Sequence, residues 1–155
     1  MTRKLGIVGA VLVLGALGFG LGAASARSGI ANPITLTVFE HSTTDKVIDV
    51  GRNGDSTCDI LTFHNNLYDE IDATKVGTLQ GQCVRESPRA GTWECWWTMS
   101  LADGQVTVEG PFSDTSNTAF AVTGGTGIYE NVRGSMQVEA VHGGAEYKQT
   151  FSLIP

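Results

Sequence analysis

The sequence predicts an all-β protein built as an eight-stranded antiparallel β-barrel. Eight segments of strand length alternate or mix apolar and polar residues, clusters of Gly, Asp, Asn and Ser separate them, and no segment carries a long apolar stripe at helical spacing. Eight antiparallel strands close a barrel whose interior holds side chains and one small ligand. A sandwich of seven or eight strands is the competing arrangement.

The expected strands follow one another from residue 34 to the C-terminal end. The first, ITLTVFE, is β-branched and aromatic, and the fourth carries three tryptophans. Turn residues punctuate the chain at 52–55, 68–70, 87–91 and 102–104, and Gly124, Gly125 and Gly127 mark a further sharp turn. The expected strands are Ile34–Glu40, Cys58–Phe63, Val76–Val84, Trp93–Leu101, Gln105–Phe112, Thr118–Thr123, Ser135–Val141 and Glu146–Leu153.

Residues 1–26 are typical of a signal peptide, and residues 27–155 form the expected barrel domain. Arg3 and Lys4 give a basic start, the run Leu5–Leu21 has no charge, and Ala24-Ser25-Ala26 supplies the small-x-small pattern of a cleavage site. An uncleaved membrane anchor is the alternative, because about 20 apolar residues span a bilayer as a helix. We expect cleavage after Ala26 and secretion.

The net charge of the chain excludes two classes of partner. It is −6 at neutral pH, and loss of Arg3 and Lys4 would leave the mature chain more acidic still. No basic stripe offsets this charge, so the sequence predicts no nucleic-acid binding and no attraction to anionic membranes.

Three cysteines in a secreted domain leave one unpaired. Cys83 and Cys95 flank the turn 87–91 at matching distances, which places them opposite each other in a hairpin and predicts a disulfide between them. A Cys58–Cys83 link, or three reduced and buried cysteines, are the alternatives.

Four segments resemble, in order and spacing, the plant allene oxide cyclases and, more loosely, the dirigent proteins that share their barrel. They are GDSTCDILTFHNNLYDE (Gly54–Glu70), VGTLQGQC (Val76–Cys83), VEGPF (Val108–Phe112) and AVTGGTGIYENVRG (Ala121–Gly134). The resemblance runs from about Val38 to the C-terminus. It implies an eight-stranded barrel with an apolar lumen, often trimeric in plants, in a group whose bacterial members include cyclases that catalyse intramolecular cycloadditions.

The resemblance also implies the site. Glu40 matches the lumen glutamate that stabilises positive charge on the opening epoxide. Two alternatives are that Glu40 acts as a general acid, or that it is a residue at the end of a strand that faces solvent. Asn65 matches an asparagine that helps to hold a water in the plant site. The alternative is that Asn65 only caps a loop at the end of a strand. Ser42 replaces another asparagine and a proline is missing near Asp49, which argues against epoxide opening. Phe112 replaces a tyrosine of the pocket and loses its hydroxyl. The expected catalytic residues are Glu40 and Asn65, and the expected substrate-binding residues are Phe63, Cys83, Phe112, Trp97, Ser42 and Leu61.

Other site types have little support in the sequence. His41, His64 and His142 do not fall at metal-ligand spacing, so we expect no metal and no cofactor. Trp93 and Trp97 share one face of their strand and Trp96 takes the other, which is compatible with core filling, a subunit interface or an aromatic wall for a developing cation.

Two functional classes follow. The first is a cofactor-independent cyclase or isomerase of an apolar, polyunsaturated small molecule, polyketide-like or lipid-like, held in the lumen. The second is a non-catalytic extracellular protein that binds a small ligand or orients it in the manner of a dirigent protein, which suits a secreted chain. Either is compatible with a homodimer or homotrimer.

Overall fold

The computed structural model describes residues 33–155. The predicted signal peptide and the cleavage site after Ala26 lie outside the described residues. Within the described part of the chain, no helix is long and apolar enough to cross a membrane.

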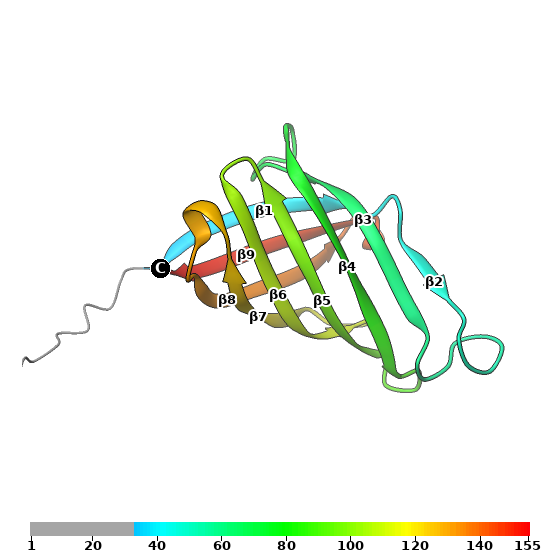
Figure 1. Ribbon diagram of the computed structural model, residues 1–155. Coiled ribbons are helices and arrows are strands. Elements are labelled where there is room, and N and C mark those ends of the chain that lie inside the picture. The colour runs from blue at the N-terminus through cyan, green and yellow to red at the C-terminus, as the bar shows by residue number, and fades with distance from the viewer. Residues whose placement is uncertain (1–32) are drawn as a thin grey trace, which may run out of the picture.

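The described chain forms one antiparallel sheet that closes into a barrel. The sheet order is β1-β9-β8-β7-β6-β5-β4-β3, and β1 pairs with both β9 and β3, so eight strands form a closed ring (Figure 1). The elements are β1 (Ile34–His41), β2 (Lys46–Ile48), β3 (Ile60–Tyr68), β4 (Lys75–Ser87), β5 (Thr92–Leu101), β6 (Gly104–Ser113), β7 (Thr118–Gly125), the 3₁₀ turn η1 (Gly127–Tyr129), β8 (Arg133–Val141), the 3₁₀ turn η2 (His142–Gly144) and β9 (Glu146–Ile154). The expected barrel is confirmed and the sandwich is excluded.

The structure corrects three details of the sequence prediction. The short strand β2 was not expected; it pairs with the start of β3, whose end pairs with β1. The second expected strand, Cys58–Phe63, begins instead at Ile60 and continues to Tyr68, because Asn65 and Leu67 carry the inward alternation past Phe63. Cys58 lies in the preceding turn, with φ of 77°. The glycine-rich turn starts later than predicted, since β7 includes Gly124 and Gly125 and only Gly127 has positive φ.

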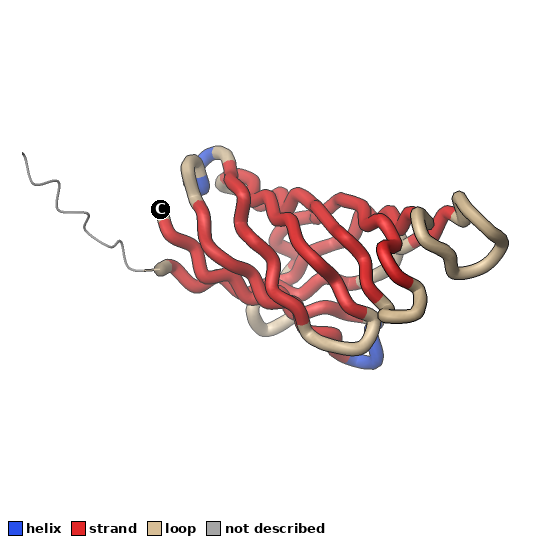
Figure 2. Tube along the Cα trace, turned by 90° about the horizontal axis from the view of Figure 1, so that it is seen from below, coloured by secondary structure: helices blue, strands red, loops and turns tan. Residues whose placement is uncertain are grey.

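Inward-facing residues fill one part of the barrel completely. Alternate residues of each strand point inward, and burial of such aliphatic and aromatic side chains contributes about 1.5–3 kcal/mol each. The filling residues, each at most 4 % exposed, are Val38, Leu67, Leu79, Met99, Val106, Phe120, Val122, Met136, Phe151 and Leu153. The remaining interior, toward the start of β3 and the end of β6, is open. β2 and the loop that follows it project beyond the barrel, at the right of both views (Figure 2).

Candidate functional site

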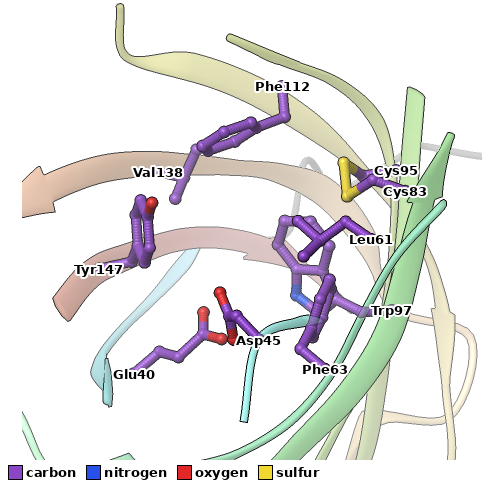
Figure 3. A pocket seen from close by; sticks show the side chains of 10 residues that line it. All are labelled: Glu40, Asp45, Leu61, Phe63, Cys83, Cys95, Trp97, Phe112, Val138 and Tyr147. Atoms are coloured by element: carbon purple, nitrogen blue, oxygen red, sulfur yellow. A yellow bond between two sulfur atoms is a disulfide. The ribbon is translucent and has the colours of Figure 1, made fainter. Parts of the chain in front are cut away.

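The open part of the barrel is a narrow pocket with aromatic and aliphatic walls and two carboxyl groups. Its lining residues are Glu40, Asp45, Leu61, Phe63, Cys83, Cys95, Trp97, Phe112, Val138 and Tyr147 (Figure 3). The space open to the centres of water molecules is about 50 Å³, room for a few waters. Phe112, Val138 and Tyr147 also line an outer hollow of about 370 Å³. These three side chains therefore stand between the inner pocket and the barrel mouth.

Glu40, near the end of β1, is the buried carboxyl of the pocket. Its side chain faces inward and is only 7 % exposed, with Asn65 Nδ2 donating to Oε1 at 2.7 Å and Gln149 Nε2 donating to Oε2 at 2.8 Å. The pKa of Glu40 is raised from 4.5 to about 7, chiefly by burial and also by the nearby charge of Asp45, while the hydrogen bonds from Asn65 and Gln149 oppose the rise. Both protonation states of Glu40 are therefore accessible near neutral pH.

Asn65, from the middle of β3, holds the polar side of the pocket together. Its Nδ2 donates to Glu40 and, at 2.6 Å, to Asp45 Oδ1. Its Oδ1 accepts from the backbone amides of Thr43 and Thr44, at 3.1 and 3.0 Å, and from the Thr44 hydroxyl. All its hydrogen-bonding atoms are engaged inside the protein, so Asn65 positions the two carboxyl groups rather than contacting a ligand.

Sequence reasoning missed Asp45 and Tyr147, which also line the pocket. Tyr147 pairs with Glu40 across β1 and β9, and both point inward. Burial raises the pKa of the Tyr147 hydroxyl, and the charges of Asp45 and Glu40 add to the rise. The sequence does carry a signal for Tyr147. It is separated from Phe151 and Leu153 by even numbers of positions, so strand alternation places all three on the same, inward face. Asp45 lies in a loop between strands, where no periodicity shows which side chain enters the barrel.

Trp97 and Phe63 form one aromatic wall. Both residues pair with Gly81 of β4, which lies between their strands and has no side chain, and their rings meet edge to face with centroids 5.9 Å apart. Trp97 is 7 % exposed, and its buried Nε1 has no hydrogen-bond partner in the described part of the chain. Trp97 thus supplies an aromatic face and an unused donor. Trp93 also faces inward, whereas Trp96 is 42 % exposed on the outside, the two-sided pattern expected from the strand.

Of the other residues that the sequence predicts to bind substrate, all but Ser42 line the pocket. Leu61, Phe63, Cys83 and Phe112 all border the pocket. Cys83 and Cys95 are linked as a disulfide on its wall, so neither offers a thiol there, and Cys58 is free and exposed. Ser42 does not line the pocket: its amide binds the carbonyl of Ala145 at 3.0 Å, and its buried hydroxyl has no partner.

An ion-pair cluster tethers the loop at residues 49–59 to the barrel. Arg85 binds Asp55 through two nitrogens and Asp114 through a third, and its guanidinium lies 4.4 Å from the centre of the Trp93 ring. Trp93 Nε1 donates to Asp114 at 2.8 Å. The hydrogen bond from Arg85 lowers the pKa of Asp55. Within residues 33–155, neither pocket carboxyl group forms an ion pair with a Lys or Arg side chain.

Comparison with known proteins gives one family and one fold. A model of the allene oxide cyclase family matches residues 33–153. A pyocyanin demethylase is 26 % identical over 77 % of this chain and 99 % of its own, with a TM-score of 0.68. A pterocarpan synthase dirigent protein (18 % identity, 79 % of this chain and 93 % of its own, TM-score 0.62) and a Diels–Alderase from Streptomyces koyangensis (17 %, 83 % and 71 %, TM-score 0.62) share the fold.

Proposed function

The chain belongs to the allene oxide cyclase family, whose barrels include cyclases and dirigent proteins, and from that premise we propose that it is a cofactor-independent cyclase or isomerase. Its substrate would be an apolar, conjugated small molecule bound in the barrel. The observation that carries the proposal is Glu40: a carboxyl almost fully buried in an aromatic pocket, with a pKa of about 7. A buried acid with a pKa near the working pH is the usual form of a general acid or base.

The proposed reaction is a proton-neutral rearrangement. The Glu40 carboxylate accepts a proton from a carbon beside the conjugated system, and the resulting carboxylic acid returns a proton at another atom, so that the composition of the substrate is unchanged. Trp97 Nε1, which has no hydrogen-bond partner among residues 33–155, would donate to an oxygen on which negative charge develops. The aromatic walls hold the substrate in the folded shape that an intramolecular ring closure needs.

Substrate entry requires Phe112, at the mouth of the pocket, to move. The inner pocket alone holds a few waters, whereas sites for small molecules usually measure roughly 300–1,000 Å³. Phe112 contacts Tyr147 edge to face with centroids 5.8 Å apart. A rotation of Phe112 would join the inner pocket to the outer hollow and make a space of ligand size.

Turnover by the Glu40→Gln variant tests this proposal. The purified barrel would be incubated with two probes, a linear polyene carrying a tethered alkene and pyocyanin, and the products followed by liquid chromatography and mass spectrometry. We expect a product of unchanged mass, and kcat about 100-fold lower in Glu40→Gln with similar affinity, because the substitution removes a proton acceptor but little volume. For the wild type, kcat/KM should rise with pH through about 7.

Glu109→Gln is the matched control. Glu109 is exposed on β6, so the same loss of charge occurs outside the barrel and turnover should be unchanged. Glu40→Gln turnover equal to that of wild type would remove Glu40 from catalysis. Binding without conversion, detected by quenching of tryptophan fluorescence, would favour the second candidate function, a dirigent-like binding protein, which the dirigent neighbours support at the level of fold. Loss of a methyl group from pyocyanin would instead favour a demethylase.

We also infer that the barrel acts outside the cytoplasm. The basic start, apolar run and Ala24-Ser25-Ala26 support export, and a disulfide is typical of oxidising compartments. Intact-mass analysis of the exported protein should find a chain starting at Arg27, and non-reducing peptide mapping should recover Cys83 linked to Cys95 with Cys58 alkylatable. Full-length chain confined to the membrane fraction, or Cys58 in the disulfide, would contradict these inferences.

A further inference from the structure

A second cluster of polar side chains lies on the outside of the barrel wall that carries Glu40. On the paired strands β1 and β9, Glu40 and Tyr147 form one cross-strand pair and His41 and Glu146 form the next. Because successive residues of a strand point to opposite faces, the first pair enters the pocket and the second lies on the outer wall. The turn between β3 and β4 brings Asp72 to the same place.

The ligand atoms of these three residues are already close together. His41 Nε2 lies 2.8 Å from Asp72 Oδ1 and 3.9 Å from Glu146 Oε1, and the three atoms all lie within 4.8 Å of one another. Ligands bound to one metal ion at about 2.0–2.2 Å are separated by about 3–3.5 Å. The cluster therefore needs only small side-chain shifts to surround an ion.

We propose that His41, Asp72 and Glu146 form a binding site for a divalent transition-metal ion, with Zn²⁺ the best match. One imidazole nitrogen and two carboxylate oxygens make a mixed N/O set, which suits such ions better than Mg²⁺ or Ca²⁺, whose ligands are oxygens. Three protein ligands leave a coordination position for water or a fourth ligand.

The surroundings hold each ligand in place. The His41 ring stacks on Tyr68 with centroids 4.0 Å apart. Asp72 has a φ of 57°, and its amide donates to the Asp69 carbonyl at 2.9 Å, within a turn that presents its carboxylate to His41. His142 Nδ1 lies 2.6 Å from Glu146 Oε2, which orients that carboxylate or supplies a fourth ligand. The three ligands are partly exposed, at 19–29 % of their side-chain surface, so an ion can enter.

Charge also favours a cation here. Among residues 33–155, Asp72 and Glu146 form ion pairs only with histidines, and no Lys or Arg neutralises them. Two carboxylates facing one imidazole leave net negative charge that a divalent ion would balance. Linear spacing did not reveal this site, because its ligands come from residues 41, 72 and 146 and meet only after the barrel closes.

An ion at this place would join the end of β1, the start of β9 and the β3–β4 turn. It would bind on the outer surface, apart from the pocket, and would stabilise the folded state because the unfolded chain does not bring the three ligands together. The inference is independent of the proposed reaction, and its test does not use catalytic activity.

Zinc binding by the untagged barrel, first stripped with a chelator, provides the test. Isothermal titration with ZnCl₂ should show one site per chain, and zinc should raise the melting temperature. Asp72→Asn should weaken zinc binding by about 100-fold and abolish the rise in melting temperature, whereas His142→Gln should weaken binding by about 10-fold. His64→Gln is the control, since His64 is exposed on β3 outside the cluster, and it should bind as the wild type does.

Equal zinc affinity in the wild type and in folded Asp72→Asn, judged by circular dichroism, would overturn the proposal, as would loss of binding in His64→Gln. If Asp72→Asn does not fold, the position of zinc in crystals of the wild type provides the test instead. Crystals soaked in zinc should show an anomalous peak at about 2.0–2.2 Å from His41 Nε2 and from both carboxylates. A peak elsewhere, or none, would also overturn it.

Discussion

Asn65→Ala should lower the free energy of unfolding by about 3 kcal/mol or more, because a buried polar group that loses its partner costs about 1–3 kcal/mol. The substitution removes the acceptor of the Thr43 and Thr44 amides and the one amide that bridges Glu40 and Asp45. The two carboxyl groups would then face each other without a donor between them. Urea denaturation near pH 7 measures the loss.

Asn66→Ala is the matched control for this prediction. Asn66 is the next residue of β3, on the outward face, and its side chain forms no hydrogen bond with residues 33–155. Its loss should change the free energy of unfolding by less than about 0.5 kcal/mol. If Asn65→Ala is as stable as Asn66→Ala, Asn65 does not hold the carboxyl groups together. The activity of Asn65→Ala should also respond, because the hydrogen bond from Asn65 lowers the pKa of Glu40 and its removal should move the pH profile upward.

The barrel could be predicted from sequence because its signals are local. Alternation, short apolar runs and turn residues identified the eight strands of the ring, and the turn at residues 87–91 indicated the register that brings Cys83 opposite Cys95. Gly81 carries a further signal that becomes clear only with the register: a Cβ at this position would come within 2.3 Å of Trp97, so the glycine makes room for the aromatic wall.

The polar half of the site depends on contacts that local patterns do not specify. The hydrogen bond between Glu40 and Gln149 joins residues 109 positions apart, and it exists only because β1 pairs with β9 in one register. Asp45 reaches the pocket from a loop, where no alternation applies. A shift of β1 by one residue against β9 would turn Glu40 to the outer face and His41 to the inner one. Register therefore decides which carboxyl groups face the pocket and which face solvent.

Glu40→Gln should become more stable than the wild type as the pH rises. The folded pKa of about 7 lies above the usual value of 4.5, so the folded state binds the Glu40 proton more tightly than the unfolded state does. The stabilisation that this proton gives to the folded state is complete below about pH 4.5 and is lost as the pH rises to about 7. The shift corresponds to about 3 kcal/mol, at 1.36 kcal/mol for each unit.

The variant avoids this loss because an amide stays neutral at every pH. Gln149 can accommodate the new amide, since its own Oε1 is buried without a partner and can accept a hydrogen bond after rotation of the group. Urea denaturation at about pH 5 and about pH 8 should show the difference between variant and wild type growing by about 2.5 kcal/mol, while Glu109→Gln follows the wild type. A difference that does not change with pH would mean that Glu40 is ionised in the folded protein throughout this range, so that burial does not raise its pKa to about 7 and kcat/KM should not rise through that pH.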